Sequence, residues 1–325
     1  SESTPKMILQ RINTNVFHNP DAVMENIVHV TQHLRKKIEL SGGNPDRETL
    51  TVVQTLDKKN FYRADDGSCY RMYKYITDSK SYETATAELM YKAGKMFGKF
   101  QNLLKDFDAS VLNETITDFH NTPKRTANLK KAVINNISGR ADSVYAEIRT
   151  AEHLEKYADA ITSKIRIGSV PVRVTHNDTK LNNILFDKTT NDGLCVIDLD
   201  TVMPGSVLYD FGDALRFGAS SAAEDEPNLD KVYFDLDKFR GFARGFLEQT
   251  SDILIKAEIE LLPISAIVMT YECGVRFLED HICGDKYFKT HRTNHNLDRC
   301  RTQFRLVEDM EQKLDDIKNI ISECL

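Results

Sequence analysis

Four polar residues in the middle of the chain have types and a spacing that could do chemistry together. His176, Asp178 and Asn183 follow the pattern His-x-Asp-x4-Asn, and Asp198 follows after a short apolar run. An aspartate on a loop can accept a proton from an attacking hydroxyl. Asparagine and aspartate oxygens are hard ligands that suit Mg²⁺ carrying phosphate oxygens. The pattern predicts a base beside a magnesium–phosphate site, which is what phosphoryl transfer to an alcohol requires.

A β-hairpin would bring these residues together. The apolar runs 183–186 and 194–199 are separated by residues 187–193, a turn-rich segment that ends in Asp-Gly. This pattern is typical of two antiparallel strands joined by a short loop. Both open ends of the hairpin then carry polar groups, with Asn182 and Asp200 among them. A solvated hairpin rich in Asn and Asp is the alternative, but the combined spacing favours a phosphotransferase.

The bulk properties narrow the class of protein. The chain has 325 residues, 41% hydrophobic and 28% charged, with a net charge of −6. This length suggests two domains or lobes, and the acidic balance argues against a general nucleic-acid-binding protein. No run approaches the roughly 18 apolar residues that span a bilayer, and the start shows no signal-peptide pattern. The six cysteines form no CxxC pair, so we expect reduced thiols in a cytoplasmic protein without membrane partners.

The predicted elements change in character near residue 76. Residues 1–76 predict a small antiparallel sheet with one helix, which Asn19 would cap and Pro20 would begin. Residues 77–325 are mainly helical, except for the central hairpin and the strand that leads into it. We therefore predict an α+β protein. The expected strands are 6–12, 50–56, 61–63, 69–76 and 171–175, and the expected helices 84–104, 126–136, 141–160, 207–217, 235–247, 253–271, 273–281 and 298–321.

Two strings carry a family resemblance. HNDTKLNN at 176–183 followed by VIDLD at 196–200 resembles the aminoglycoside and choline kinase-like phosphotransferases. This resemblance implies a two-lobed protein-kinase-like fold, with a nucleotide-binding N-lobe at 1–76 and a catalytic and acceptor-binding C-lobe at 77–325. It also implies ATP as co-substrate and Mg²⁺ as cofactor.

Longer strings point to a narrower group within that family. They resemble kinases that phosphorylate N-acetylhexosamines, GlcNAc or GalNAc, at the anomeric hydroxyl. The partners implied are a sugar and a nucleotide. The strings are ILQRINTNVF (8–17), HNDTKLNNILFD (176–187), VIDLDTVMPG (196–205), YDFGDALRFGAS (209–220) and GVRFLEDHICGDKYF (274–288).

The resemblance implies a role for each of the central polar residues. Asp178 is expected to orient or deprotonate the anomeric hydroxyl. Asn183 and Asp198 are expected to hold Mg²⁺ against the nucleotide phosphates. His176 and Asp210 are expected to support the catalytic loop without touching substrate.

The resemblance also implies two binding surfaces. Arg276 and Tyr287, with Phe217 in the same pocket, are expected to contact the sugar. The nucleotide is expected to meet the lobe joint and the basic strand end, through Tyr75, Ile76, Arg11 and Glu25.

Two departures from the family pattern concern the nucleotide. Many kinases have a lysine on the strand where this chain reads Leu9-Gln10-Arg11, so Arg11 is expected to replace it, with Glu25 as its partner. A guanidinium presents several hydrogen-bond donors in a planar fork, whereas an ammonium is a compact point charge. Arginine and lysine would therefore bind the phosphates differently. The family also places two strands and a phosphate-covering turn ahead of this strand. We therefore expect the N-lobe to lack its first strands in this chain.

Other functions remain open from the sequence. One is a kinase of the same fold that acts on choline, homoserine, methylthioribose or an aminoglycoside. The positive charges of Arg276 and Lys286 argue mildly against a cationic acceptor. Another is a nucleotide-binding module without turnover, although the intact Asp178, Asn183 and Asp198 favour an enzyme. The sequence does not rank GlcNAc against GalNAc, and it does not give the nucleotide preference or the oligomeric state.

Overall fold

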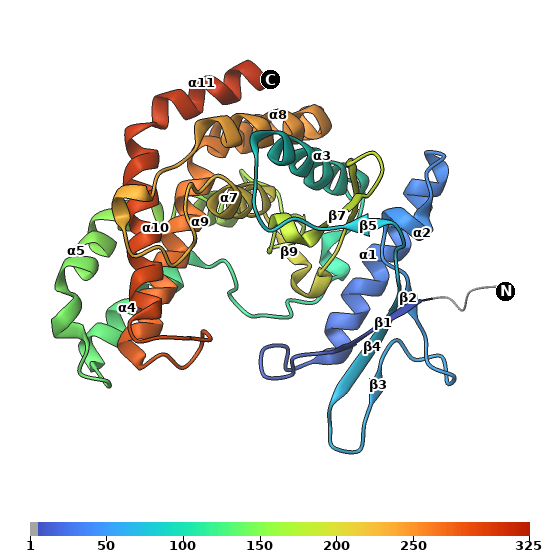
Figure 1. Ribbon diagram of the computed structural model, residues 1–325, viewed down its shortest axis with the longest axis horizontal. Coiled ribbons are helices and arrows are strands. Elements are labelled where there is room, and N and C mark those ends of the chain that lie inside the picture. The colour runs from blue at the N-terminus through green and yellow to red at the C-terminus, as the bar shows by residue number, and fades with distance from the viewer. Residues whose placement is uncertain (1–5) are drawn as a thin grey trace.

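The computed structural model describes residues 6–325 and begins with a small antiparallel sheet (Figure 1). Strand β4 (Cys69–Lys74) is its centre, and its side chains alternate between a buried and a more exposed face, as in a half-covered strand. Cys69, Arg71 and Tyr73 lie on the buried face. The strands are β1 (Met7–Arg11), β2 (Val52–Val53), β3 (Tyr62–Arg63) and β4 (Cys69–Lys74), and the other three all pair with β4.

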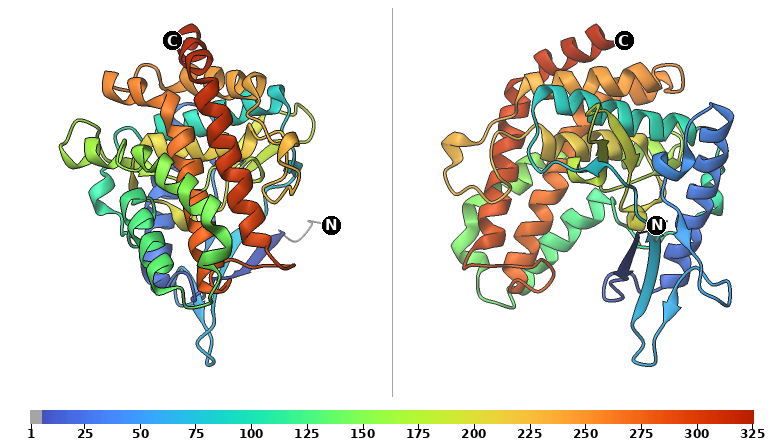
Figure 2. Two further views of the ribbon diagram at one scale, coloured as in Figure 1. Left: turned by 90° about the vertical axis from the view of Figure 1, so that its left-hand side faces the viewer. Right: turned by 45° about the vertical axis from the view of Figure 1, so that its right-hand side comes forward.

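Helix α1 (Pro20–Leu40) packs beside this sheet, as the second view in Figure 2 shows. Asn19 caps it by accepting a hydrogen bond from the Ala22 N–H at 3.3 Å, and Pro20 fills the first turn, both as predicted. A short helix, α2 (Pro45–Glu48), follows. Inside α1 the buried Asn26 donates to the Val202 carbonyl at 2.9 Å, which ties the helix to the chain just beyond Asp198.

The predicted central hairpin is confirmed. Its strands β7 (Ile184–Asp187) and β8 (Gly193–Val196) are antiparallel, and β5 (Ser79–Lys80) extends the sheet beside β7. A second pair of strands, β6 (Arg173–Thr175) and β9 (Met203–Gly205), joins the residues just before His176 to those just after Asp200. The four strands therefore hold the segments 176–183 and 197–202 next to each other.

Helices make up most of the remaining chain and cover one side of the hairpin (Figure 1). Glycines let two of them, α3 (Ala87–Leu103) and α8 (Leu236–Thr250), approach closely. A Cβ on Gly94 would lie 2.2 Å from the Phe242 carbonyl oxygen, and a Cβ on Gly245 would lie 2.1 Å from the Tyr91 carbonyl oxygen. The helices are α3 (Ala87–Leu103), α4 (Thr122–Asn135), α5 (Tyr145–Leu154), α6 (Thr162–Arg166), α7 (Val207–Gly218), α8 (Leu236–Thr250), α9 (Lys256–Cys283), α10 (His295–Gln312) and α11 (Leu314–Cys324).

Several observed boundaries differ from the predicted ones, and the helix expected at 141–160 shortens to α5 between two 3₁₀ turns. The helices expected at 253–271 and 273–281 form the single helix α9, and Glu272, the charged residue between them, is buried and hydrogen-bonded. The helix expected at 298–321 is divided at Lys313. The strand expected at 50–56 shortens to β2. In the described part of the chain, only α9 is long and apolar enough to cross a membrane, and most of it is buried among other helices.

Candidate active site

His176 holds the start of the loop that leads to Asp178. Its side chain is buried between the rings of Phe97 and Phe100. The Asp178 N–H donates to its Nδ1 at 3.2 Å, which assigns the proton to Nε2, and Nε2 donates to the Ile197 carbonyl at 2.8 Å. The ring thus links the loop to the end of the hairpin, the contact expected of a residue that supports the loop.

Asp210, on α7, clamps the same loop from behind. It is 1% exposed, and its carboxylate accepts from the backbone N–H groups of His176 at 2.9 Å and Asn177 at 2.8 Å, and from Gln101 Nε2 at 2.7 Å. Burial raises the pKa of Asp210, although these donors and His176 oppose the shift. Both carboxylate oxygens of Asp210 accept hydrogen bonds, from the loop and from Gln101, which suits support of the loop rather than metal binding.

Replacing Asp210 with alanine should destabilise the protein by about 3 kcal/mol, because three buried donors lose their acceptor. Urea denaturation followed by circular dichroism measures the change. Asp252→Ala is the matched control, since Asp252 is exposed and makes no side-chain hydrogen bond within residues 6–325; it should change stability by less than about 0.5 kcal/mol. Equal stabilities of the two variants would contradict the clamp.

Asp178 itself faces outward from this frame. Its side chain is 27% exposed, Oδ1 is paired with Lys180 Nζ at 2.8 Å, and Oδ2 accepts from Asn183 Nδ2 at 3.1 Å. Asn183 Nδ2 also donates to the Asp178 carbonyl at 2.8 Å. These contacts fix a partly exposed carboxylate, which is the geometry that a general base needs.

Asn183 and Asp198 offer oxygen atoms of the kind that bind a magnesium ion. The Nδ2 of Asn183 is used by Asp178, whereas its Oδ1 accepts no hydrogen bond within the described residues and is available as a ligand. Asp198 has a left-handed backbone (φ 60°) and an accessible side chain. Partial desolvation by the surrounding protein, and the negative charges of Asp200 and Asp178, raise the pKa of Asp198. A divalent cation would relieve this crowding of carboxylates. Within residues 6–325 no three His, Cys, Asp or Glu residues converge as a metal centre, so the remaining ligands would be phosphate oxygens and water.

The basic residue that points toward this cluster is Arg71 rather than Arg11. Arg71 is 4% exposed and forms an ion pair with Asp200. Opposite residues of an antiparallel pair share a face, so Gln10 lies on the same face of the sheet as Arg71, and its Oε1 accepts a hydrogen bond from Arg71 Nε at 3.2 Å. Arg11 lies one residue further on the exposed strand β1, and it therefore points to the other face.

The expected pairing of Glu25 with a basic strand residue is wrong. Glu25 lies on the exposed side of α1, and its carboxylate accepts from Asn113 Nδ2 at 2.9 Å. Its neighbour Asn26 faces the interior and takes the structural role at this point of the helix. Across residues 6–325 Glu25 forms no ion pair.

The residues expected beside adenine lie where β4 leads into β5. The Tyr75 ring is 39% exposed, and its backbone N–H donates to the Lys6 carbonyl at 3.0 Å. The Ile76 side chain is buried, and its carbonyl accepts from Ser79 Oγ at 2.7 Å. Tyr75 therefore offers a surface to a ligand, whereas Ile76 contributes to the core beneath it.

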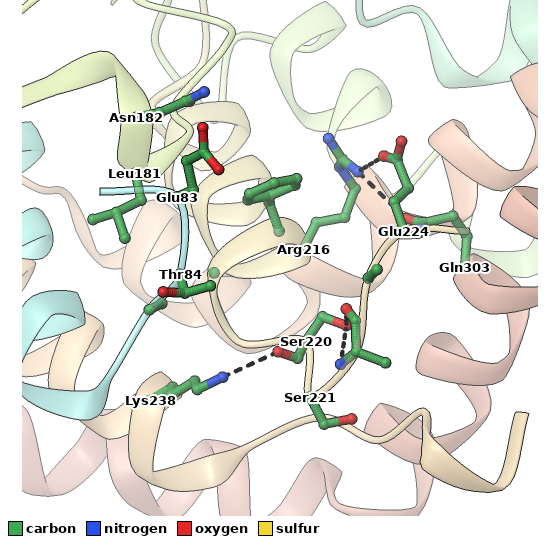
Figure 3. A pocket seen from close by; sticks show the side chains of 15 residues that line it. Glu83, Thr84, Leu181, Asn182, Arg216, Ser220, Ser221, Glu224, Lys238 and Gln303 are labelled. Carbon is green, nitrogen blue, oxygen red and sulfur yellow. Dashed lines mark hydrogen bonds and ion pairs between the residues drawn. The ribbon is translucent and has the colours of Figure 1, made fainter. Parts of the chain in front are cut away.

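Phe217 is one of the residues that line a cavity of about 500 Å³. This cavity lies beside the 176–183 loop (Figure 3). Leu181 and Asn182 of the loop form one wall, and Glu83 and Thr84 approach from the segment before α3. On the far side Arg216 pairs with Glu224 at 2.9 Å, which fastens the 220–224 loop over the end of α7.

Arg276 and Tyr287 lie together in a different cavity, of about 250 Å³, so the structure separates them from Phe217. The Arg276 guanidinium is 5.8 Å from the centre of the Tyr287 ring, 5.4 Å from that of Phe288 and 5.6 Å from that of Phe119. Three rings thus orient one cation. Asp280 shapes the loop beneath them by accepting the backbone N–H groups of residues 286–288.

Sequence reasoning missed three residues that shape this site. Lys180 pairs with Asp178, and Arg71 pairs with Asp200. Asp213 accepts the Thr179 N–H at 3.0 Å and is paired with Arg216. Arg71 could have been found from the alternation of side chains in the strand 69–74. Lys180 could have been found from its position in the loop, two residues after Asp178. For Asp213, the sequence offered only its position three residues after Asp210, on the same side of a predicted helix.

Comparisons with solved structures show what this chain is similar to in fold. The chain is similar in fold to a microcompartment-associated aminopropanol kinase (14% identity, TM-score 0.62, covering 98% of this chain and 88% of that one). It is also similar to an aminoglycoside phosphotransferase from Alicyclobacillus acidocaldarius (12%, 0.62, 99% and 89%) and to choline kinase from Cryptosporidium parvum (13%, 0.55, 99% and 87%). These likenesses confirm the predicted kinase-like α+β fold.

A sequence model described as the phosphotransferase enzyme family, APH, matches residues 3–245, which is most of the chain. The match includes the whole of the 176–183 loop and the hairpin that follows it, with Asp178, Asn183 and Asp198. The chain therefore belongs to the APH phosphotransferase family, and it is a small-molecule phosphotransferase.

Proposed function

We propose that this enzyme transfers the γ-phosphoryl group of ATP to the anomeric hydroxyl of an N-acetylhexosamine. Asp178 is the base, and Asn183 and Asp198 hold the Mg²⁺ that binds the nucleotide. The observation that carries the phosphoryl-transfer step is the position of Asp178, fixed between Lys180 and Asn183 while its carboxylate stays partly exposed. Residues 1–76 would supply the nucleotide side and residues 77–325 the catalytic and acceptor side.

The mechanism needs positioning and charge stabilisation more than covalent chemistry. Asp178 accepts the hydrogen bond of the attacking hydroxyl and aligns it with the phosphorus. An anomeric hydroxyl is more acidic than an ordinary alcohol, so a carboxylate suffices as base. Mg²⁺ would neutralise the phosphate oxygens when bound. Lys180, beside Asp178, is placed to share the negative charge of the transferred group.

Two features support the assignment of an N-acetylhexosamine as the acceptor. They are the positive charge of Arg276 and the sequence strings at 209–220 and 274–288. A guanidinium held by three aromatic rings would repel the quaternary ammonium of choline or the amines of an aminoglycoside. It can donate hydrogen bonds to a neutral amide carbonyl such as that of an acetamido group. Rings beside it suit the apolar faces of a sugar.

A product assay by mass spectrometry tests the acceptor. ATP and Mg²⁺ are supplied with GlcNAc, GalNAc, choline, ethanolamine, homoserine, methylthioribose or an aminoglycoside. We expect a sugar 1-phosphate from GlcNAc or GalNAc at a rate at least about tenfold above that of any other acceptor, the equivalent of roughly 1.4 kcal/mol of transition-state discrimination. Phosphocholine without any sugar phosphate would refute the acceptor assignment and leave phosphoryl transfer intact.

A further inference from the structure

A buried histidine–glutamate pair lies outside the catalytic set described so far. His120 and Glu272 have side chains only 7% and 2% exposed, and His120 Nδ1 lies 2.8 Å from Glu272 Oε1. The Thr122 hydroxyl donates to Oε2 of the same carboxylate at 2.6 Å. Burial opposes ionisation of Glu272, but His120, Arg276 and Thr122 together lower its pKa, so it is a carboxylate that receives the Nδ1 proton.

The other ring nitrogen of His120 has no partner. Nε2 is enclosed by protein, and no atom within residues 6–325 makes a hydrogen bond with it. A buried polar atom without a partner costs about 1–3 kcal/mol. With Nδ1 donating to Glu272, Nε2 accepts a hydrogen bond when the ring is neutral and donates one when the ring is protonated. A hydroxyl group can be its partner in either case, because a hydroxyl both donates and accepts.

The His120 ring lies between the loop that carries Asp178 and the arginine proposed to contact the acceptor, Arg276. Tyr209 of α7 and Phe119 flank it, with ring centres 5.0 and 4.5 Å away. A cavity of about 610 Å³ is lined by all three and by Asn177, the residue before Asp178. Phe119 in turn lies against Arg276. His120 therefore stands between the catalytic loop and the arginine expected to contact the acceptor.

We infer that His120, oriented by Glu272, binds a second hydroxyl of the acceptor through Nε2 and so selects polyhydroxylated acceptors. The Glu272 carboxylate fixes the orientation of the His120 ring, and the ring then binds a hydroxyl group rather than transferring a proton. The inference rests on the proposed function only in requiring an acceptor with more than one hydroxyl.

The test compares His120→Phe with wild type, because phenylalanine keeps the ring between Phe119 and Tyr209. We expect KM for the sugar to rise about tenfold, the cost of one lost hydrogen bond, while KM for ATP changes by less than about twofold. Glu272→Gln should raise the sugar KM by a smaller factor, since it weakens the orientation and leaves the ring. His153→Phe, on the exposed side of α5, is the matched control and should behave as wild type.

A panel of deoxy sugars separates binding from a packing role. If Nε2 binds one hydroxyl, the His120→Phe penalty should vanish for the analogue that lacks that hydroxyl and persist for the others. An equal penalty on every analogue, or an unchanged sugar KM, would overturn the inference while the proposed function stands. Choline turnover without sugar turnover by wild type would remove the proposed function, and this inference with it, because choline has a single hydroxyl.

Discussion

Asp178→Asn should lower kcat by about a thousandfold, or roughly 4 kcal/mol in the activation free energy. The substitution removes the negative oxygen that we propose accepts the proton of the attacking hydroxyl. It keeps the size of the side chain, and the backbone contacts of the loop to His176 and Asp210 do not involve the altered group. Steady-state kinetics with saturating ATP and sugar measure the loss, and calorimetry should show nucleotide affinity changed by less than about threefold.

A neighbouring substitution provides the matched control for this experiment. Asp192→Asn alters an exposed aspartate in the turn of the same hairpin, where its partner is Lys92. It should leave kcat unchanged. The altered Asp178 side chain also brings an amide near Asn183 Nδ2, so thermal melting is recorded for both variants. A folded Asp178→Asn enzyme with wild-type turnover would remove Asp178 from its role as base.

The catalytic hairpin could be predicted because its signals are local. The apolar runs, the Asp-Gly turn and the spacing from His176 to Asn183 all lie within one stretch, and the structure forms the strands β7 and β8 there. The cap of α1 is local in the same sense. A pattern of neighbouring residues decides such features before any distant segment is placed.

Features that depend on distant pairing could not be predicted. Whether Arg11 or Arg71 faces the site depends on the register of β1 against β4, and a shift of one residue would exchange the two faces. The family resemblance supplied Arg11, while the ion pair with Asp200 belongs to Arg71. The same limit applies to Phe217 and Arg276. Their helices, α7 and α9, are adjacent, but the two side chains line separate cavities.

Asp198→Asn should have two opposite effects. Mg²⁺-dependent nucleotide binding should weaken at least about a hundredfold, because the ion loses its charged protein ligand. The ligand-free protein should melt at a higher temperature than wild type, because the substitution removes a carboxylate that is partly desolvated and repelled by Asp200 and Asp178. Asp198→Ala should abolish metal-dependent binding as well. Calorimetry with ATP, in the presence and absence of Mg²⁺, and thermal melting without ligand check the two effects.

The pH dependence of melting distinguishes this explanation from an unrelated gain in packing. A carboxyl group whose pKa is raised in the folded state binds its proton more tightly there than in the unfolded chain. The wild-type protein therefore loses stability as the pH rises from the ordinary aspartate pKa, about 4, through the raised value, and the loss is complete above it. The advantage of Asp198→Asn should be full near neutral pH and shrink as the pH falls toward about 4. An advantage independent of pH, or unchanged Mg²⁺-dependent nucleotide binding, would exclude Asp198 as the crowded carboxylate that receives the metal.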